Sequence, residues 1–197
     1  MREILIRALS GIVYVAAIIG SILYAKESFY IVFYLLMILC LYEFKKLIHL
    51  SYKWTFIVAS LIFVNAIDIP ILDSKYLHFL LVISLFVPVV YQLFKSKITL
   101  TSSKLGHYFL ALAYIALPFA MLVQIPFINS EYHPEIIISV FILIWVSDTF
   151  AYLVGSNIGK TKLYEKVSPN KTIEGALGGL VAAFIAGYII SLYLTKI

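Results

Sequence analysis

The chain has 197 residues, of which 63% are hydrophobic and 13% are charged, and its formal net charge is +5. Its mean hydropathy is +1.02. A water-soluble domain cannot bury so much apolar surface, so the composition excludes that class and indicates an integral membrane protein. The single cysteine, Cys40, lies inside an apolar run, which excludes an internal disulfide framework.

Apolar runs of about 17 to 24 residues recur along the chain, and this is the length that a helix needs to cross the hydrocarbon core of a bilayer. The first run resembles a signal peptide, but its length, the missing small-residue cleavage pattern and the span directly behind it favour a retained helix. We expect seven spans: residues 8–25, 28–44, 54–72, 76–94, 108–128 and 136–154, and a last run that carries Glu174 near its start.

The predicted fold is therefore all-α, a polytopic transmembrane helix bundle of about seven spans. It is expected to form a single integral membrane domain over residues 1–197. Within it, residues 1–135 supply the N-terminal helices, and residues 136–197 form a helix–loop–helix that carries the polar motifs.

Lysines and arginines are distributed unequally when the spans are alternated across the membrane. Three of them, Lys26, Lys75 and Lys196, fall on one side. The other twelve fall on the opposite side: Arg2, Arg7, Lys45, Lys46, Lys53, Lys95, Lys97, Lys104, Lys160, Lys162, Lys166 and Lys171. By the positive-inside rule the second side is cytoplasmic, which predicts that the loop from Gly155 to Lys171 faces the cytosol.

Asp148 lies within the apolar run from Ile136 to Val154. A carboxylate at membrane depth costs about 2.5–3.5 kcal/mol on insertion scales unless it is paired, hydrated or liganded. After Gly155 the chain becomes basic and rich in turn residues. Pro169 suits the first turn of a helix with Ser168 as its cap, and Thr172 is a second candidate cap, so we expect free backbone N–H groups that would favour a phosphate here.

Part of the loop is similar to the nucleotide-binding P-loop, because it contains Gly155, Gly159, Lys160 and Thr161. That motif requires four residues between its glycines and a preceding β-strand. Here three residues separate the glycines and the preceding element is an expected membrane helix, so we reject a P-loop.

Small residues recur every fourth position on the last two expected spans. They are Ser147, Ala151 and Gly155 on one, and Gly175, Gly179, Ala183 and Gly187 on the other. Such stripes let two helices approach closely, which would gather Asp148 and the turn 168–174 around one cytoplasm-facing cavity. A purely structural contact is the alternative, and both interpretations can hold together.

The polar and glycine residues of this region resemble the phosphatidate cytidylyltransferase (CDP-diacylglycerol synthase) family. The residues that carry the resemblance are Asp148 to Tyr152, Gly155, Gly159, Lys160, Lys162, Leu163, Val167 to Gly175, Gly178 and Gly179. The resemblance implies a multispanning membrane enzyme of phospholipid biosynthesis that uses CTP and a divalent metal to convert phosphatidic acid into CDP-diacylglycerol and pyrophosphate. Family members carry a second signature farther on, a Lys-Arg and Lys-Asp segment followed by a His-Gly-Gly and Asp-Arg segment. It does not occur before Ile197, so we expect a truncated or fragmentary member.

Nucleotidyl transfer needs cations and hydrogen-bond donors around phosphates. The residues expected to be catalytic are Asp148, Lys171 and Glu174, of which Asp148 and Glu174 are also expected to bind Mg²⁺ or another divalent cation. The residues expected to bind substrate are Lys160, Ser168, Asn170, Thr172 and Gly175. Lys162 and Lys166 are equally well explained by topology alone.

The expected partners are CTP, phosphatidic acid and membrane lipids, with no nucleic acid, and a homodimer is left open. The expected location is the cell inner (cytoplasmic) membrane with the active face toward the cytoplasm. The alternative function is that of a non-catalytic membrane protein derived from this family, which binds lipid and nucleotide or acts in assembly.

Overall fold

The computed structural model describes residues 2–47, 54–68, 104–165 and 167–194, and the statements below refer to these residues. The chain divides into two compact units, Met1–Phe127 and Ile128–Ile197. The division therefore falls before residue 135, where the sequence suggested the N-terminal helices would end. Each unit is described by itself.

The first unit is helical. Its elements are α1 (Arg2–Tyr24), α2 (Lys26–Leu47), α3 (Trp54–Asp68), α5 (Lys104–Ala111), the π-helical turn η1 (Leu112–Ala116) and α6 (Leu117–Leu122). One face of α2 is buried, at Phe29, Phe33, Met37 and Leu41. Because these residues recur every fourth position, they form a single stripe along the helix, and this stripe belongs to the core of the unit.

A π-helical turn lies directly before a proline in this unit. Pro118 stands in the first turn of α6, and the five residues Leu112–Ala116 just before it form η1. A proline ring clashes with the carbonyl group four residues earlier in a regular α-helix. The wider π turn opens the backbone at that point, so the helical path continues through the proline to Leu122.

A tight hairpin joins the two units, with strands β1 (Phe127–Ile128) and β2 (Glu131–Tyr132). The two residues between the strands, Asn129 and Ser130, have positive φ values of 50° and 69°. Positive φ at both positions is typical of the type I′ turn that best fits the twist of a two-residue hairpin.

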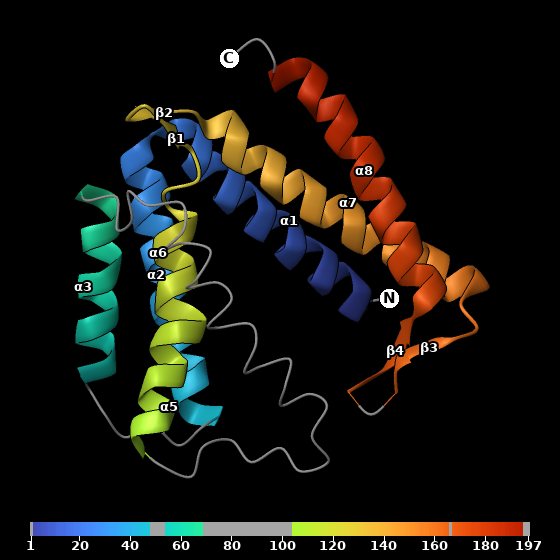
Figure 1. Ribbon diagram of the computed structural model, residues 1–197, viewed down its shortest axis with the longest axis horizontal. Coiled ribbons are helices and arrows are strands. Elements are labelled where there is room, and N and C mark those ends of the chain that lie inside the picture. The colour runs from blue at the N-terminus through green and yellow to red at the C-terminus, as the bar shows by residue number, and fades with distance from the viewer. Residues whose placement is uncertain (1, 48–53, 69–103, 166, 195–197) are drawn as a thin grey trace. The chain divides into compact units, whose positions relative to one another are not determined.

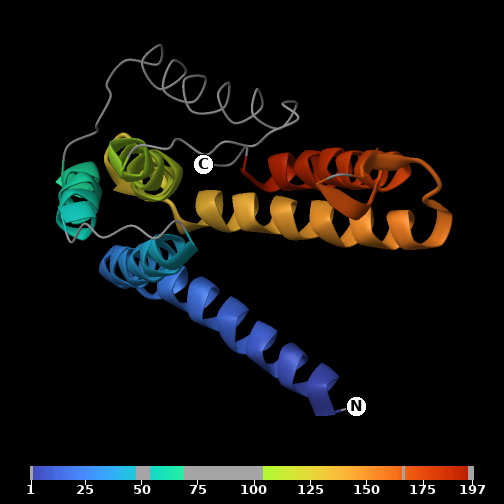
Figure 2. The same cartoon turned by 90° about the horizontal axis from the view of Figure 1, so that it is seen from below.

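The second unit consists of α7 (Pro134–Ile158), β3 (Lys162–Tyr164), β4 (Ser168–Thr172) and α8 (Ile173–Leu194). The two helices run side by side, and the antiparallel β3–β4 hairpin lies at the end where α7 stops and α8 begins (Figures 1 and 2). The described part of the expected segment 136–197 thus has two helices with a β-hairpin between them.

Glycines set the distance between α7 and α8. A Cβ added at Gly179 would lie 2.7 Å from the carbonyl oxygen of Ser147 and 3.0 Å from Cβ of Ala151, and one added at Gly175 would lie 2.7 Å from the carbonyl oxygen of Ala151. The predicted contact between small-residue stripes is therefore confirmed. Gly175, Gly179 and Ala182 are buried residues of α8, and Ala183 is half-buried.

Membrane-spanning helices are fewer in the described residues than the sequence suggested. Three helices are long and apolar enough to cross a membrane: α2, α7 and α8. Shorter apolar segments cover 9–24, 54–67 and 112–122, and the expected span 76–94 lies outside the described residues. A count of seven is not confirmed, and the expected fifth span stops at Leu122 because a turn and the β1–β2 hairpin follow. The fold is mostly helical, and the all-α expectation is corrected by the two hairpins.

Candidate functional site

The segment Ser168–Thr172 is a β-strand, not the first turn of a helix. It pairs with β3 through Lys162 opposite Thr172 and Tyr164 opposite Ser168, with an irregular register between them. The prediction that Ser168 caps a helix beginning at Pro169 was therefore wrong. Pro169 has no N–H to give to a strand partner, but its carbonyl oxygen accepts a hydrogen bond from Nζ of Lys162 at 2.5 Å, which holds the hairpin together.

Thr172 is the cap of α8. Its buried side-chain oxygen accepts a hydrogen bond from the backbone N–H of Gly175 at 3.1 Å, which is the usual geometry between a cap residue and the third residue of the helix. Neighbouring glycines make room for this side chain. A Cβ at Gly159 would lie 2.6 Å from the Thr172 hydroxyl oxygen, and one at Gly155 would lie 3.0 Å from it. Thus α7, the hairpin and α8 meet around one threonine.

Glu174 lies in the first turn of α8 and faces the start of the hairpin. Its carboxylate accepts backbone hydrogen bonds from Lys160 at 3.1 Å and from Thr161 at 3.1 and 3.2 Å. The backbone N–H of Ile173 in turn donates to the carbonyl oxygen of Thr161 at 2.9 Å. The short segment that leaves α7 is thereby fixed to the beginning of α8.

A cleft of about 780 Å³ lies between α7, the hairpin and the first turn of α8. The residues that line it are Asp148, Ala151, Tyr152, Gly155, Ser156, Leu163, Ser168, Asn170, Lys171, Thr172, Gly175 and Ala176. Six of the residues singled out from the sequence are therefore brought together in it: Asp148, Ser168, Asn170, Lys171, Thr172 and Gly175. Lys160 and Glu174 are not among its lining residues.

Tyr152, Ser156 and Leu163 line the cleft and were not predicted as site residues. Tyr152 and Ser156 follow Asp148 by one and two helical turns, so the spacing alone places them on the face of α7 that carries the carboxylate. The four-residue spacing from Asp148 could therefore have identified both residues from the sequence. Leu163 reaches the cleft through the β3–β4 pairing, which no clear pattern in the sequence predicted.

Asp148 and Lys171 supply the charges of the cleft. Both side chains are exposed, and neither forms an ion pair or a side-chain hydrogen bond with the residues that the structure describes. The described ion pairs lie elsewhere, for example between Lys46 and Glu43. One acidic and one basic group are thus available to a ligand in the same cleft.

The two carboxylates expected to bind a metal have different surroundings: Asp148 lines the cleft and Glu174 does not. Both oxygens of the Glu174 carboxylate accept backbone hydrogen bonds, and no group of three or more His, Cys, Asp or Glu residues suited to a metal ion occurs in the described chain. Mg²⁺ often takes only one or two protein carboxylates and completes its shell with water and substrate phosphates. Asp148 fits that role, and Glu174 in this arrangement does not.

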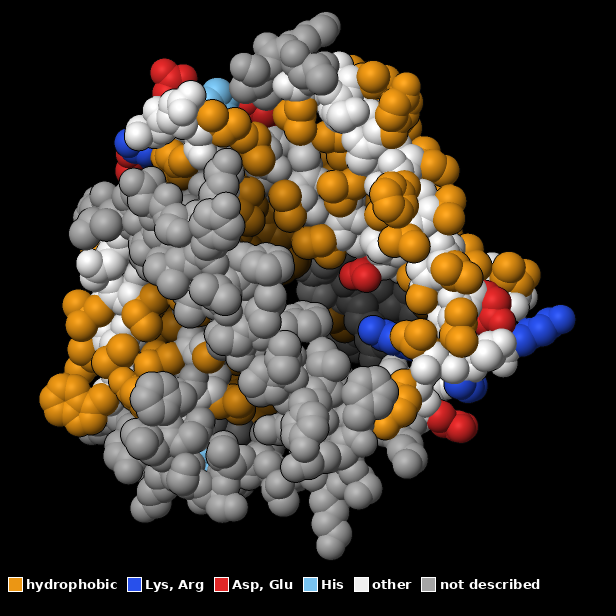
Figure 3. Space-filling view, in the orientation of Figure 1, with side chains coloured by type: hydrophobic (Ala, Val, Ile, Leu, Met, Phe, Trp, Pro, Cys, Tyr) orange, Lys and Arg blue, Asp and Glu red, His pale blue; other side chains and the backbone are white. Residues whose placement is uncertain are grey.

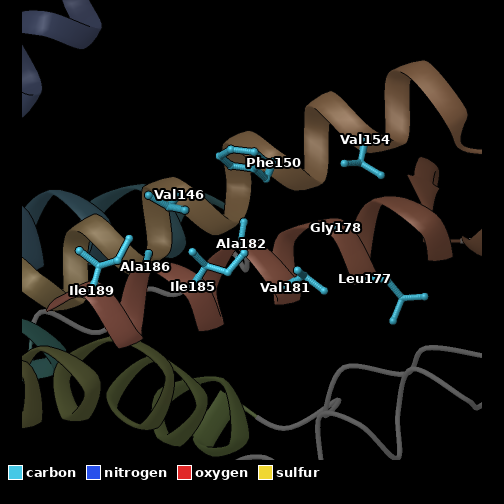
Figure 4. Close-up of a pocket in the computed structure, with 10 residues that line it drawn as sticks. All are labelled: Val146, Phe150, Val154, Leu177, Gly178, Val181, Ala182, Ile185, Ala186 and Ile189. Carbon is cyan, nitrogen blue, oxygen red and sulfur yellow. The ribbon is translucent and has the colours of Figure 1, made fainter. Parts of the chain in front are cut away.

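A second cavity, of about 510 Å³, opens on another face of the α7–α8 pair. Figure 4 shows side chains of both helices around it, among them Val146, Phe150, Val181 and Ile185. Its lining residues are Val, Phe, Leu, Gly, Ala and Ile only, so it offers no side chain that could bind a phosphate. The polar cleft is therefore the candidate site for charged substrates.

The likeness to a P-loop is excluded by the secondary structure. Gly155 lies inside α7, which continues to Ile158, so a helix precedes Gly159 and Lys160 where a P-loop needs a strand.

Together, three apolar helices long enough to cross a bilayer and a polar cleft at the hairpin end of α7 and α8 indicate an integral membrane protein with a candidate site for a charged ligand. The chain belongs to the cytidylyltransferase family, whose sequence model it matches over residues 5–197. No solved structure matches it significantly.

Curated relatives carry the name phosphatidate cytidylyltransferase. The protein from Bacillus subtilis is 38% identical over 96 residues, which are 49% of this chain and 35% of the relative. The protein from Aquifex aeolicus is 45% identical over 71 residues, 36% of this chain and 26% of the relative. A Staphylococcus aureus protein is 51% identical over 49 residues, 25% of this chain and 19% of the relative. The matched parts thus span about a fifth to a third of the length of these relatives.

Proposed function

We propose that the cleft binds CTP and phosphatidic acid for cytidylyl transfer, which gives CDP-diacylglycerol and pyrophosphate in phospholipid biosynthesis. The observation that carries this proposal is that Asp148, Lys171 and the polar residues of β4 line one cleft in a chain of the cytidylyltransferase family. The names of the relatives supply the choice of phosphatidate as the acceptor.

The reaction moves a cytidylyl group from one phosphate to another. An oxygen of the lipid phosphate attacks the α-phosphorus of CTP, a new P–O bond forms, and the bond between the α-phosphorus and the bridging oxygen breaks as pyrophosphate leaves. A phosphate monoester already carries at least one deprotonated oxygen at neutral pH, so the attacking oxygen needs no general base. Positioning and charge neutralisation are therefore the tasks left to the protein.

The residues of β4 are suited to those tasks. The exposed ammonium group of Lys171 can pair with phosphate oxygens, and the Ser168 hydroxyl and the Asn170 amide can donate hydrogen bonds to them. All three lie on a strand that is anchored by the buried Thr172, so their backbone positions are fixed before a substrate arrives.

Asp148 is the residue that would hold a divalent cation, with substrate phosphates as the remaining ligands. Such a cation, when bound, would supply positive charge close to the phosphates that carry charge in the reaction. The cation held by Asp148 and the ammonium group of Lys171 would both offset the negative charge of the substrate phosphates.

The cleft is proposed to face the cytoplasm of the inner membrane, where CTP is available. The surface of α8 is covered by hydrophobic side chains, whereas lysines and acidic residues gather around β3 and β4 (Figure 3). Exposed apolar residues of α8, such as Phe184 and Tyr188, suit contact with lipid. The basic hairpin agrees with the cytoplasmic side of the positive-inside rule.

The test is CTP-dependent formation of CDP-diacylglycerol by the 197-residue chain in liposomes that contain phosphatidic acid and Mg²⁺, together with binding of labelled CTP. Asp148→Asn and Lys171→Ala should each lower turnover by about 100-fold or more, the usual loss when one charge-stabilising group is removed. Lys160→Ala should be milder because Lys160 does not line the cleft. Glu165→Gln, which removes an exposed carboxylate in the hairpin turn, is the matched control and should retain activity.

Unchanged turnover in Asp148→Asn would contradict the proposed role of the cleft. Binding of CTP without turnover by the wild-type chain, and also by a version extended with the second family signature, would instead support the non-catalytic alternative, a membrane protein that binds nucleotide and lipid. Turnover by the extended version alone would assign the missing activity to the segment that carries that signature.

A further inference from the structure

The carboxylate of Glu174 connects the first turn of α8 to the segment that precedes β3. It accepts three backbone hydrogen bonds of 3.1–3.2 Å from the N–H groups of two successive residues, Lys160 and Thr161. We call this set the Glu174–loop contact. A carboxylate is an acceptor only, and hydrogen bonds to a charged group are stronger than those between neutral groups.

The contact lies where the hairpin begins. Thr161 directly precedes β3, and its carbonyl oxygen accepts the backbone N–H of Ile173 at 2.9 Å, so the chain is fixed to the start of α8 in both directions. Lys162, the next residue, pairs with Thr172 at the end of β4. Any movement of the 160–161 segment is therefore passed to β3 and, through the strand pairing, to β4.

We infer that Glu174 is a positioning residue, which holds the hairpin so that Lys171 and Asn170 stay at the cleft, and that it is not a metal ligand. This inference rests on the proposed function only for the identity of the ligand in the cleft. Its structural part concerns backbone groups of this chain and can be measured without any substrate. It revises the role that the sequence suggested for Glu174.

Amide hydrogen exchange is the direct test. It is measured on the full chain in detergent micelles by NMR, without nucleotide or metal. In the wild type the amides of Lys160 and Thr161 should be protected. In Glu174→Ala they should exchange at least about tenfold faster, which matches the loss of charge-assisted hydrogen bonds. The strand amides of β3 and β4 should also exchange faster, while the amides in the middle of α7 and α8 keep their wild-type rates.

Two variants provide controls. Glu174→Gln keeps one acceptor oxygen and should restore part of the protection that Glu174→Ala loses. Glu165→Gln removes the same charge from the hairpin turn without touching the contact, and it should leave exchange at Lys160 and Thr161 unchanged.

Nucleotide binding gives the second measurement. Titration with labelled CTP should show affinity reduced about tenfold or more in Glu174→Ala and partly restored in Glu174→Gln, with no change in the Mg²⁺ concentration needed for half-maximal binding. Wild-type exchange rates at Lys160 and Thr161 in Glu174→Ala would overturn the inference. So would a higher Mg²⁺ requirement in Glu174→Gln together with unchanged exchange. If the wild type bound no CTP, the proposed function would fail, while the exchange experiment would still decide the role of Glu174.

Discussion

Gly179 allows the contact between α7 and α8 to be tested with a single methyl group. A Cβ at this position would lie 2.7 Å from the carbonyl oxygen of Ser147, closer than real Cβ contacts come, and 3.0 Å from Cβ of Ala151. Neither neighbour can rotate away, because one is backbone and the other is a methyl group fixed to it. The helices must therefore separate, and overpacking of this kind typically costs about 1–3 kcal/mol.

Gly187→Ala is the matched control for Gly179→Ala. Gly187 lies on the same helix, but a Cβ there would meet only Cδ2 of Leu143 at 3.7 Å, an ordinary contact. Both changes gain helix propensity, up to about 1 kcal/mol in water, and this gain cancels when the two variants are compared. The expected difference in stability is therefore the overpacking term alone.

The difference can be measured as a midpoint of thermal unfolding in detergent, followed by tryptophan fluorescence at one heating rate. For a chain of this size each kcal/mol corresponds to about 2–4 °C, so Gly179→Ala should unfold about 2–12 °C below Gly187→Ala. Gly179→Leu should be less stable still, because a larger side chain separates the helices further. Equal midpoints for the two alanine variants would refute the close approach of α7 and α8 at this glycine.

Two further predictions concern the hairpin. Thr172→Ala removes the cap of α8 and should lower the free energy of unfolding by about 0.5–2 kcal/mol. Thr172→Ser keeps the acceptor oxygen and should recover most of the loss. A thermal midpoint of Thr172→Ala equal to that of the wild type would contradict the capping role. The second prediction concerns the orientation in the membrane and uses Glu165→Cys in a Cys40→Ser background. This cysteine should not react with an impermeant thiol reagent added to intact cells, but it should react after the cells are opened. Labelling in intact cells would contradict the proposed topology.

The contact between the last two helices could be predicted because it depends on a local pattern. Gly175 and Gly179 are four residues apart, as are Ala151 and Gly155, and a stripe of small residues has the same meaning wherever the helix lies. The place of Asp148 in the polar cleft was predictable for a similar reason, since a carboxylate in an apolar run is costly unless it is paired, hydrated or liganded. Both predictions need only the helical period and the composition around each residue.

The β3–β4 hairpin could not be predicted in the same way. Ser168 followed by Pro169 is compatible with a helix start, but proline is equally tolerated at irregular strand positions, and the choice depends on pairing with Lys162 and Tyr164. That pairing depends in turn on where α7 ends. The sequence indicated an end near Gly155, where the basic and turn-rich segment begins, but α7 continues through Gly155 to Ile158.

The roles of Lys160, Lys171 and Glu174 show why residue type alone did not assign the site. Both lysines are in the basic loop, yet only Lys171 lines the cleft, because it lies on the strand that pairs across the hairpin. The sequence predicted Glu174 as a metal ligand because carboxylates near phosphate sites often bind metal ions. Its carboxylate accepts hydrogen bonds from the backbone N–H groups of Lys160 and Thr161, and every residue except proline carries such a group, so the sequence pattern does not mark these contacts. A carboxylate used in this way makes the hairpin rigid at its base, and Asp148 then remains as the acidic side chain in the cleft that is open to a cation.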